Sequence, residues 1–181
     1  MTVATEPPDL AWLGIPDDPL WRFALDIYQR PGVAEACLSL QDDCGADVNL
    51  LLFALWCAAE GEELTPDTAR AAGAAIAPWS AVAIQPLRRL RRALKPPVAG
   101  VPDDRREAVR NRTKSLELAA ERIALARLHE FAREMSRPPA SANRDRAMRD
   151  NLSAALALAA AGNDARSAPA VERLVAAVLR G

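Results

Sequence analysis

The sequence predicts an all-α protein, a compact orthogonal or antiparallel helical bundle with an added C-terminal helical hairpin. Alanine, leucine, arginine and glutamate dominate the composition, and all four are strong helix formers. Aromatic residues make up only 4% of the chain, and β-branched residues are also sparse, so strand formers are few. Apolar residues recur three and four positions apart along several segments, which is the period of an amphipathic helix.

The 181 residues divide into three expected parts. Residues 1–18 form an irregular, proline-rich arm, residues 19–136 form the bundle, and residues 141–181 form the hairpin. Prolines, glycines and capping residues mark where helices begin and end. We expect helices over residues 19–29, 33–41, 48–60, 66–79, 81–95, 103–135, 143–161 and 168–179.

Local signals support these boundaries. Asp17 or Asp18 before Pro19 is a typical helix start, and Thr65 precedes another proline in the same way. Residues 48–60 are apolar on every side, which predicts the most buried, central helix. Ser80 is expected to cap the helix of residues 81–95, in which Pro86 should cause a kink or a restart.

The cysteines and the apolar runs favour a cytoplasmic protein. Three cysteines without a CxxC spacing support neither a disulfide framework nor a zinc site. The N-terminal residues lack the basic and apolar blocks of a signal peptide. The longest apolar run, residues 48–59, is too short for a membrane span, which needs about 20 residues.

Charge is unevenly distributed along the chain. Residues 1–60 carry ten acids and two bases, whereas residues 61–181 carry fourteen acids and twenty-one bases. Either the acidic first helices pack against basic helices of the same chain, or a charged surface is free for a partner. Both interpretations stay open from the sequence.

Polar residues surround the start of the apolar helix. Asp47 stands where it can cap that helix. Asn49 falls at its second position, where a buried amide needs hydrogen-bond partners. We interpret Gln41, Asp43, Asp47 and Asn49 as a structural polar knot or a possible site.

The same acids suggest an alternative function. Asp43 and Asp47 form a DxxxD pattern, and helical enzymes that act on isoprenyl diphosphates hold Mg²⁺ with such aspartates. Gly45 lies between the two acids and should break the helix that would align them, and no second aspartate-rich motif follows. We therefore expect no metal and no cofactor.

Glu117 and Glu121 are expected to pair with arginines. Both acids flank the apolar stripe that we predict on the helix of residues 103–135, formed by Val109, Leu116, Ala120, Ile123, Leu128 and Phe131. A carboxylate in that position needs a partner because burying an unpaired charge is costly. The expected partners are Arg88, Arg89, Arg91 and Arg92 of the segment LRRLRRALK. A di-metal carboxylate site would add Glu-x-x-His pairs, and the sequence contains none.

The arginine segment could also bind phosphate groups. Its arginines flank a stripe of Leu87, Leu90 and Leu94, aromatic residues for base stacking are missing nearby, and the pI is about 5.9. We therefore do not expect a nucleic-acid partner.

Three stretches carry a family resemblance: LWRFALDIYQRPGVAEACLSLQDDCGADVNLLLFALW, PLRRLRRALK and KSLELAAER. The chain resembles, over roughly residues 20–130, a bacterial family catalogued as domain of unknown function 2390. The resemblance implies a small, helical, cytoplasmic protein and no known activity. The hairpin after Arg137 lies beyond it.

These observations together lead to one expected function. No catalytic set of residues has the required spacing, and charge is segregated. We expect a non-enzymatic adaptor or regulator with a protein partner or a second copy of itself. The alternative is a small ligand-binding or Mg-diphosphate-dependent helical enzyme using the acids near Asp43 and Asp47.

Overall fold

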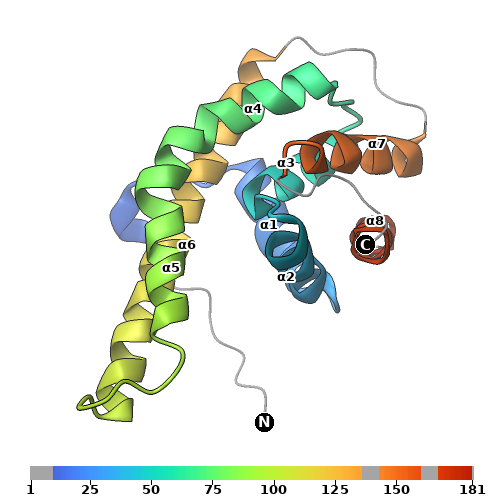
Figure 1. Ribbon diagram of the computed structural model, residues 1–181. Helices are drawn as coiled ribbons and strands as arrows, with labels where there is room; N and C mark the ends of the chain where they lie inside the picture. The colour runs from blue at the N-terminus through green and yellow to red at the C-terminus, as the bar shows by residue number, and fades with distance from the viewer. Residues whose placement is uncertain (1–9, 136–142, 160–166, 181) are drawn as a thin grey trace. The chain divides into compact units, whose positions relative to one another are not determined.

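The computed structural model describes residues 10–135, 143–159 and 167–180. These residues form helices and no strand, which confirms the all-α class (Figure 1). The helices are α1 (Pro19–Tyr28), α2 (Val33–Cys44), α3 (Val48–Ala59), α4 (Pro66–Trp79), α5 (Gln85–Ala93), α6 (Asp103–Glu134), α7 (Arg144–Leu156) and α8 (Ala168–Leu179), with a 3₁₀ turn at Ala11–Leu13 and a π turn at Ser80–Ile84.

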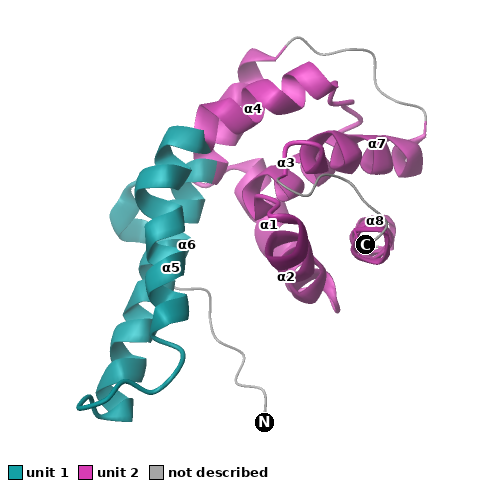
Figure 2. Cartoon of the chain, viewed as in Figure 1, with its two compact units in different colours: residues 1–16, 77–124 teal, residues 17–76, 125–181 magenta. Residues whose placement is uncertain are grey.

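The chain folds into two compact units (Figure 2). Unit 1 comprises residues 1–16 and 77–124, and unit 2 comprises residues 17–76 and 125–181. Helices α4 and α6 each contribute residues to both units.

The core of unit 2 is built around α3. All residues from Val48 to Ala58 are buried, as their continuous apolar run predicts. Helices α1, α2, α7 and α8 contact α3, and they supply apolar residues such as Leu20, Leu40 and Leu152. The helix ends where Gly61 takes a φ of +83°, a conformation that glycine adopts without steric cost.

The C-terminal helices belong to this core. Helix α7 packs against α3, α8 packs against α2, and the two helices contact each other. The compact units therefore do not follow the division expected at residues 136 and 141. The buried apolar residues of α7 are three alanines together with Met148, Leu152 and Leu156, and they fill contacts with neighbouring helices.

Unit 1 departs from the expected helix boundaries. Ser80 does not cap a new helix, because the chain continues from α4 through the π turn into α5. The amide of Gln85 donates to the carbonyl of Ser80, five residues back. Pro86, which has no N–H to donate, lies at the start of α5. The wider turn accommodates the proline within a continuous helix.

The first part of α6 buries polar side chains where an apolar stripe was predicted, although Ala120 and Leu128 of that stripe are buried further along. Val109 and Leu116 are exposed, whereas Thr113 and Glu117 are buried. Helix α5 shows the same inversion, since Arg88 is buried and Leu90 is exposed. Ion pairs between α5 and α6 account for the faces that these two helices turn toward each other.

Candidate functional site

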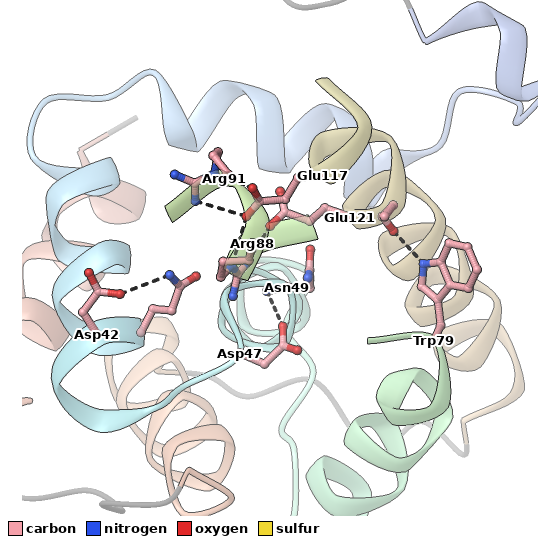
Figure 3. A network of polar contacts seen from close by, with 10 residues as sticks. Asp42, Asp47, Asn49, Trp79, Arg88, Arg91, Glu117 and Glu121 are labelled. Atoms are coloured by element: carbon pink, nitrogen blue, oxygen red, sulfur yellow. Dashed lines mark hydrogen bonds and ion pairs between the residues drawn. The ribbon is translucent and has the colours of Figure 1, made fainter. Parts of the chain in front are cut away.

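A buried charge cluster joins α5 to α6 within unit 1 (Figure 3). Glu117 accepts a hydrogen bond of 3.0 Å from Arg88 Nε and one of 3.2 Å from Arg91 Nη2, and Arg91 Nε also donates to it. Arg88 Nη2 donates to Glu121 at 2.7 Å. The side chains of Arg88 and Glu117 are only 9% and 6% exposed. The cluster therefore links the two helices through ion pairs that are largely shielded from water.

The electrostatics of Glu117 follow from this geometry. Burial disfavours its charged form, but hydrogen bonds from Arg91 and Arg88 favour that form more strongly and lower the pKa of the carboxyl below its usual value. Glu117 is thus ionised at neutral pH and shares its charge with two guanidinium groups.

The sequence predicted Arg88, Arg89, Arg91 and Arg92 around these acids, and Arg88 and Arg91 make the ion pairs given above. Arg89 and Arg92 lie on the exposed face of α5. A helix with four arginines in five positions can turn only some of them toward one neighbour, because successive residues are 100° apart. Which arginines of α5 face α6 therefore depends on how α5 is rotated about its own axis.

Two further contacts hold the α5–α6 hairpin. Trp79 Nε1 donates to the carbonyl of Ala120 at 2.9 Å (Figure 3). At the other end, Arg106 Nη1 donates to the carbonyls of Leu94 and Lys95, at 2.5 and 3.1 Å. Helix C-terminal carbonyls lack intrahelical donors, so Arg106 satisfies the end of α5.

The start of α3 has a different arrangement, in unit 2. Asp47 Oδ1 accepts from the amide of Asn49 at 2.9 Å, as expected for an N-cap. Asn49 itself is 3% exposed, and its Nδ2 has no hydrogen-bond partner among the described residues. A buried amide in this state raises the free energy of the folded chain.

The structure does not bring the four residues of the expected polar knot into one network. The side chain of Gln41 bonds to its neighbour Asp42 at 3.3 Å (Figure 3), and Asp43 accepts from Ser39 at 2.8 Å, one turn back in α2. Helix α2 extends to Cys44, so Asp43 lies on its exposed last turn, before Gly45 ends the helix at a φ of +75°.

Asn49→Leu is expected to increase the free energy of unfolding by about 1 kcal/mol. Leucine has a similar size and removes a buried donor that has no partner. Urea unfolding followed by circular dichroism measures the change. Asp47→Ala is the matched control, and loss of its cap should lower stability by about 1 kcal/mol. A destabilised Asn49→Leu protein would contradict this interpretation of the amide.

Sequence reasoning missed Asn151, which is 0% exposed in α7. Its Nδ2 donates to the carbonyls of Ala54 and Glu62, at 3.1 and 2.9 Å, and its Oδ1 accepts from the amide of Leu64 at 2.7 Å. The side chain thus fastens the loop after α3 onto α7. A lone asparagine among the apolar positions of this helix is the one available signal, and it does not reveal the partners.

The described residues contain no group of three or more His, Cys, Asp or Glu side chains that could hold a metal ion. Cys37, Cys44 and Cys57 are buried free thiols, and burial raises the pKa of Cys37 to about 12. At neutral pH its thiol is protonated and unreactive. Within the described parts of the chain, no helix has the length and apolar character of a membrane span.

Comparison with known families identifies most of this framework. A family model described as "Protein of unknown function (DUF2390)" matches residues 19–128. The chain belongs to the DUF2390 family. This match confirms the resemblance seen in the sequence. The DUF2390 range contains the buried charge cluster and the start of α3, whereas α7 with Asn151 lies outside it. Searches of curated proteins and of solved structures found no match.

Proposed function

We propose that this DUF2390 protein is a non-enzymatic cytoplasmic adaptor or regulator that acts through protein–protein contacts. The observation that carries the proposal is the α5–α6 hairpin, which exposes apolar side chains along its length. These are Leu90, Val98, Val101, Val109 and Leu116, each at least 41% exposed. Apolar side chains gathered on one exposed element are typical of a binding surface.

The charge of the hairpin indicates the character of the partner. Residues 85–116 carry ten bases and three acids. Exposed arginines beside exposed aliphatic residues fit an acidic protein surface with apolar residues of its own, because complementary charge steers association and excludes wrong partners. The buried contacts of Glu117 and Arg106 keep the two helices together, so the surface is formed before binding.

Affinity capture of the full-length tagged protein from its native cells, after crosslinking, tests the proposal. We expect a partner at stoichiometric yield, strongly reduced for Leu90→Ser/Val101→Ser. Leu158→Ser/Leu179→Ser is the matched control, since it removes two exposed leucines from unit 2. The absence of a stoichiometric partner, or equal losses in both variants, would contradict an adaptor role for the hairpin.

The alternative is a ligand-binding protein or enzyme that uses Asp43 and Asp47 with Mg²⁺ and a diphosphate. Both carboxylates already accept hydrogen bonds from the chain, from Ser39 and from the amide of Asn49. A thermal-shift titration with Mg²⁺ and inorganic diphosphate separates the two functions. Binding at a hundred times the dissociation constant would add about 2.7 kcal/mol of apparent stability and favour the alternative.

A further inference from the structure

We infer that the partner surface of the hairpin is completed by a second copy of this chain, whose acidic α2 face docks on α6. The inference rests on the proposed function and names its partner. The receiving surface is an exposed stripe of Arg105, Val109, Arg112 and Leu116, spaced by four, three and four residues. At 100° per residue these four positions lie within a sector of about 60° on α6.

Both arginines of this stripe are available for an external acid. Arg105 and Arg112 are exposed, and neither takes part in a hydrogen bond or ion pair among the described residues. They contrast with Arg106 and Arg110 on the same helix, which pair with Glu107. Val109 between the arginines is 54% exposed. The stripe therefore offers two cations on either side of an apolar side chain.

Helix α2 in unit 2 carries the complementary stripe. Glu35, Leu38 and Asp42 are exposed and spaced by three and four residues, again within a sector of about 60°. Leu38 is 45% exposed. This stripe offers two anions on either side of an apolar side chain, so its chemistry is the reverse of the α6 stripe.

The spacings of the two stripes match in one orientation. When the helices run antiparallel, Glu35 falls opposite Arg112 and Asp42 opposite Arg105, because each pair is seven residues apart, about 10.5 Å along a helix. Leu38 is three residues from Glu35, and Val109 is three residues from Arg112, so these apolar residues also meet. In the parallel orientation the apolar residues miss each other by one position.

The helix pair favours a second copy over a nucleic acid. Phosphates would use the arginines but would leave Val109 without the apolar contact that Leu38 supplies. The α2 stripe supplies both kinds of contact from the same chain. Reciprocal exchange of both stripes between two copies would give two equivalent interfaces, as in closed symmetric homodimers.

Sedimentation equilibrium of the full-length protein tests this inference. Wild type should self-associate, and added salt should weaken the association because the paired charges are exposed. Arg105→Glu/Arg112→Glu and Glu35→Arg/Asp42→Arg should each weaken self-association about tenfold or more, since each places like charges opposite each other. Circular dichroism checks that these exposed substitutions leave the fold intact.

Mixing the two variants in equal amounts should restore association as a heterodimer, because both of its interfaces regain opposite charges. Arg133→Glu/Arg146→Glu is the control with the same change in net charge as Arg105→Glu/Arg112→Glu; it leaves both stripes intact, so it should self-associate as wild type does. A monomeric wild type, unchanged association of either charge-reversed variant, or failure of the complementary mixture would overturn the inference. Those results would leave the adaptor proposal standing if affinity capture recovers a different protein.

Discussion

Glu117→Ala is expected to lower the free energy of unfolding by about 3 kcal/mol, the lower end of the range of about 3–5 kcal/mol for breaking a buried ion pair. The substitution removes a carboxylate that contacts both Arg88 and Arg91. Arg88 is nearly inaccessible to water and keeps Glu121 as a partner. That residual pair is the reason for expecting the lower end of the range.

Urea unfolding at pH 7 measures this change, and Glu130→Ala is its matched control. Glu130 pairs with Arg127 on the same helix, but both side chains are more than half exposed. Its loss should cost about 0–1 kcal/mol. Equal effects of the two substitutions would mean that burial of the Glu117 cluster does not contribute to stability.

The effect of Glu117 should also depend on pH in a definite direction. Its pKa is lower in the folded chain than in the unfolded chain, so the carboxylate stabilises the fold above the unfolded pKa of about 4.3. This contribution is lost as the pH falls through the folded pKa. The stability difference between wild type and Glu117→Gln should therefore shrink toward zero below about pH 4. A difference that grows on acidification would contradict the assigned charge state.

Asn151→Ala is expected to lower the free energy of unfolding by about 3 kcal/mol, because it strands buried backbone groups and leaves a cavity. The amide of Leu64 loses its acceptor, and the carbonyl of Glu62 loses the donor that Asn151 supplies. Hydrogen exchange should show greater exchange at Leu64, since this loop is fastened to α7 by Asn151.

Two variants separate the hydrogen bonds of Asn151 from its volume and from its helix. Asn151→Leu fills the space without restoring the hydrogen bonds, so it should stay destabilised by about 1–3 kcal/mol. Asn143→Ala removes an exposed cap of the same helix and should cost about 1 kcal/mol. A neutral Asn151→Leu would mean that packing, and not hydrogen bonding, joins the loop to α7.

Predictions from the sequence succeed where local chemistry determines the structure. Asp18 caps α1 by accepting from the amide of Trp21, and Thr65 accepts from the amide of Thr68 at the start of α4. These contacts involve residues three apart, so one short segment contains both partners. The burial of α3 also follows from its own sequence, because a helix that is apolar on all sides can remove its apolar surface from water only inside a core.

The polar groups of the candidate site depend on the assembled fold as well as on the sequence. The general need of Glu117 and Glu121 for arginines follows from their place beside apolar positions. The selection of Arg88 and Arg91, and the exposure of Val109 and Leu116, depend on the rotation of two helices against each other. The positions of the apolar residues predict the wrong buried face of α6 near Val109 and Leu116. The reason is that the facing helix α5 presents guanidinium groups instead of a hydrophobic surface.

The sequence by itself determined the helical class, the most buried helix and the caps of α1, α3 and α4, because these depend on propensity, apolar runs and contacts between near neighbours. Only the tertiary structure decided that α7 joins the core of unit 2 and that Asn151 reaches Ala54, Glu62 and Leu64. Those partners lie 87 to 97 residues away along the chain. Nothing in the sequence of α7 names such distant partners, so the position of this helix is set by the hydrogen bonds and close packing that the assembled fold makes possible.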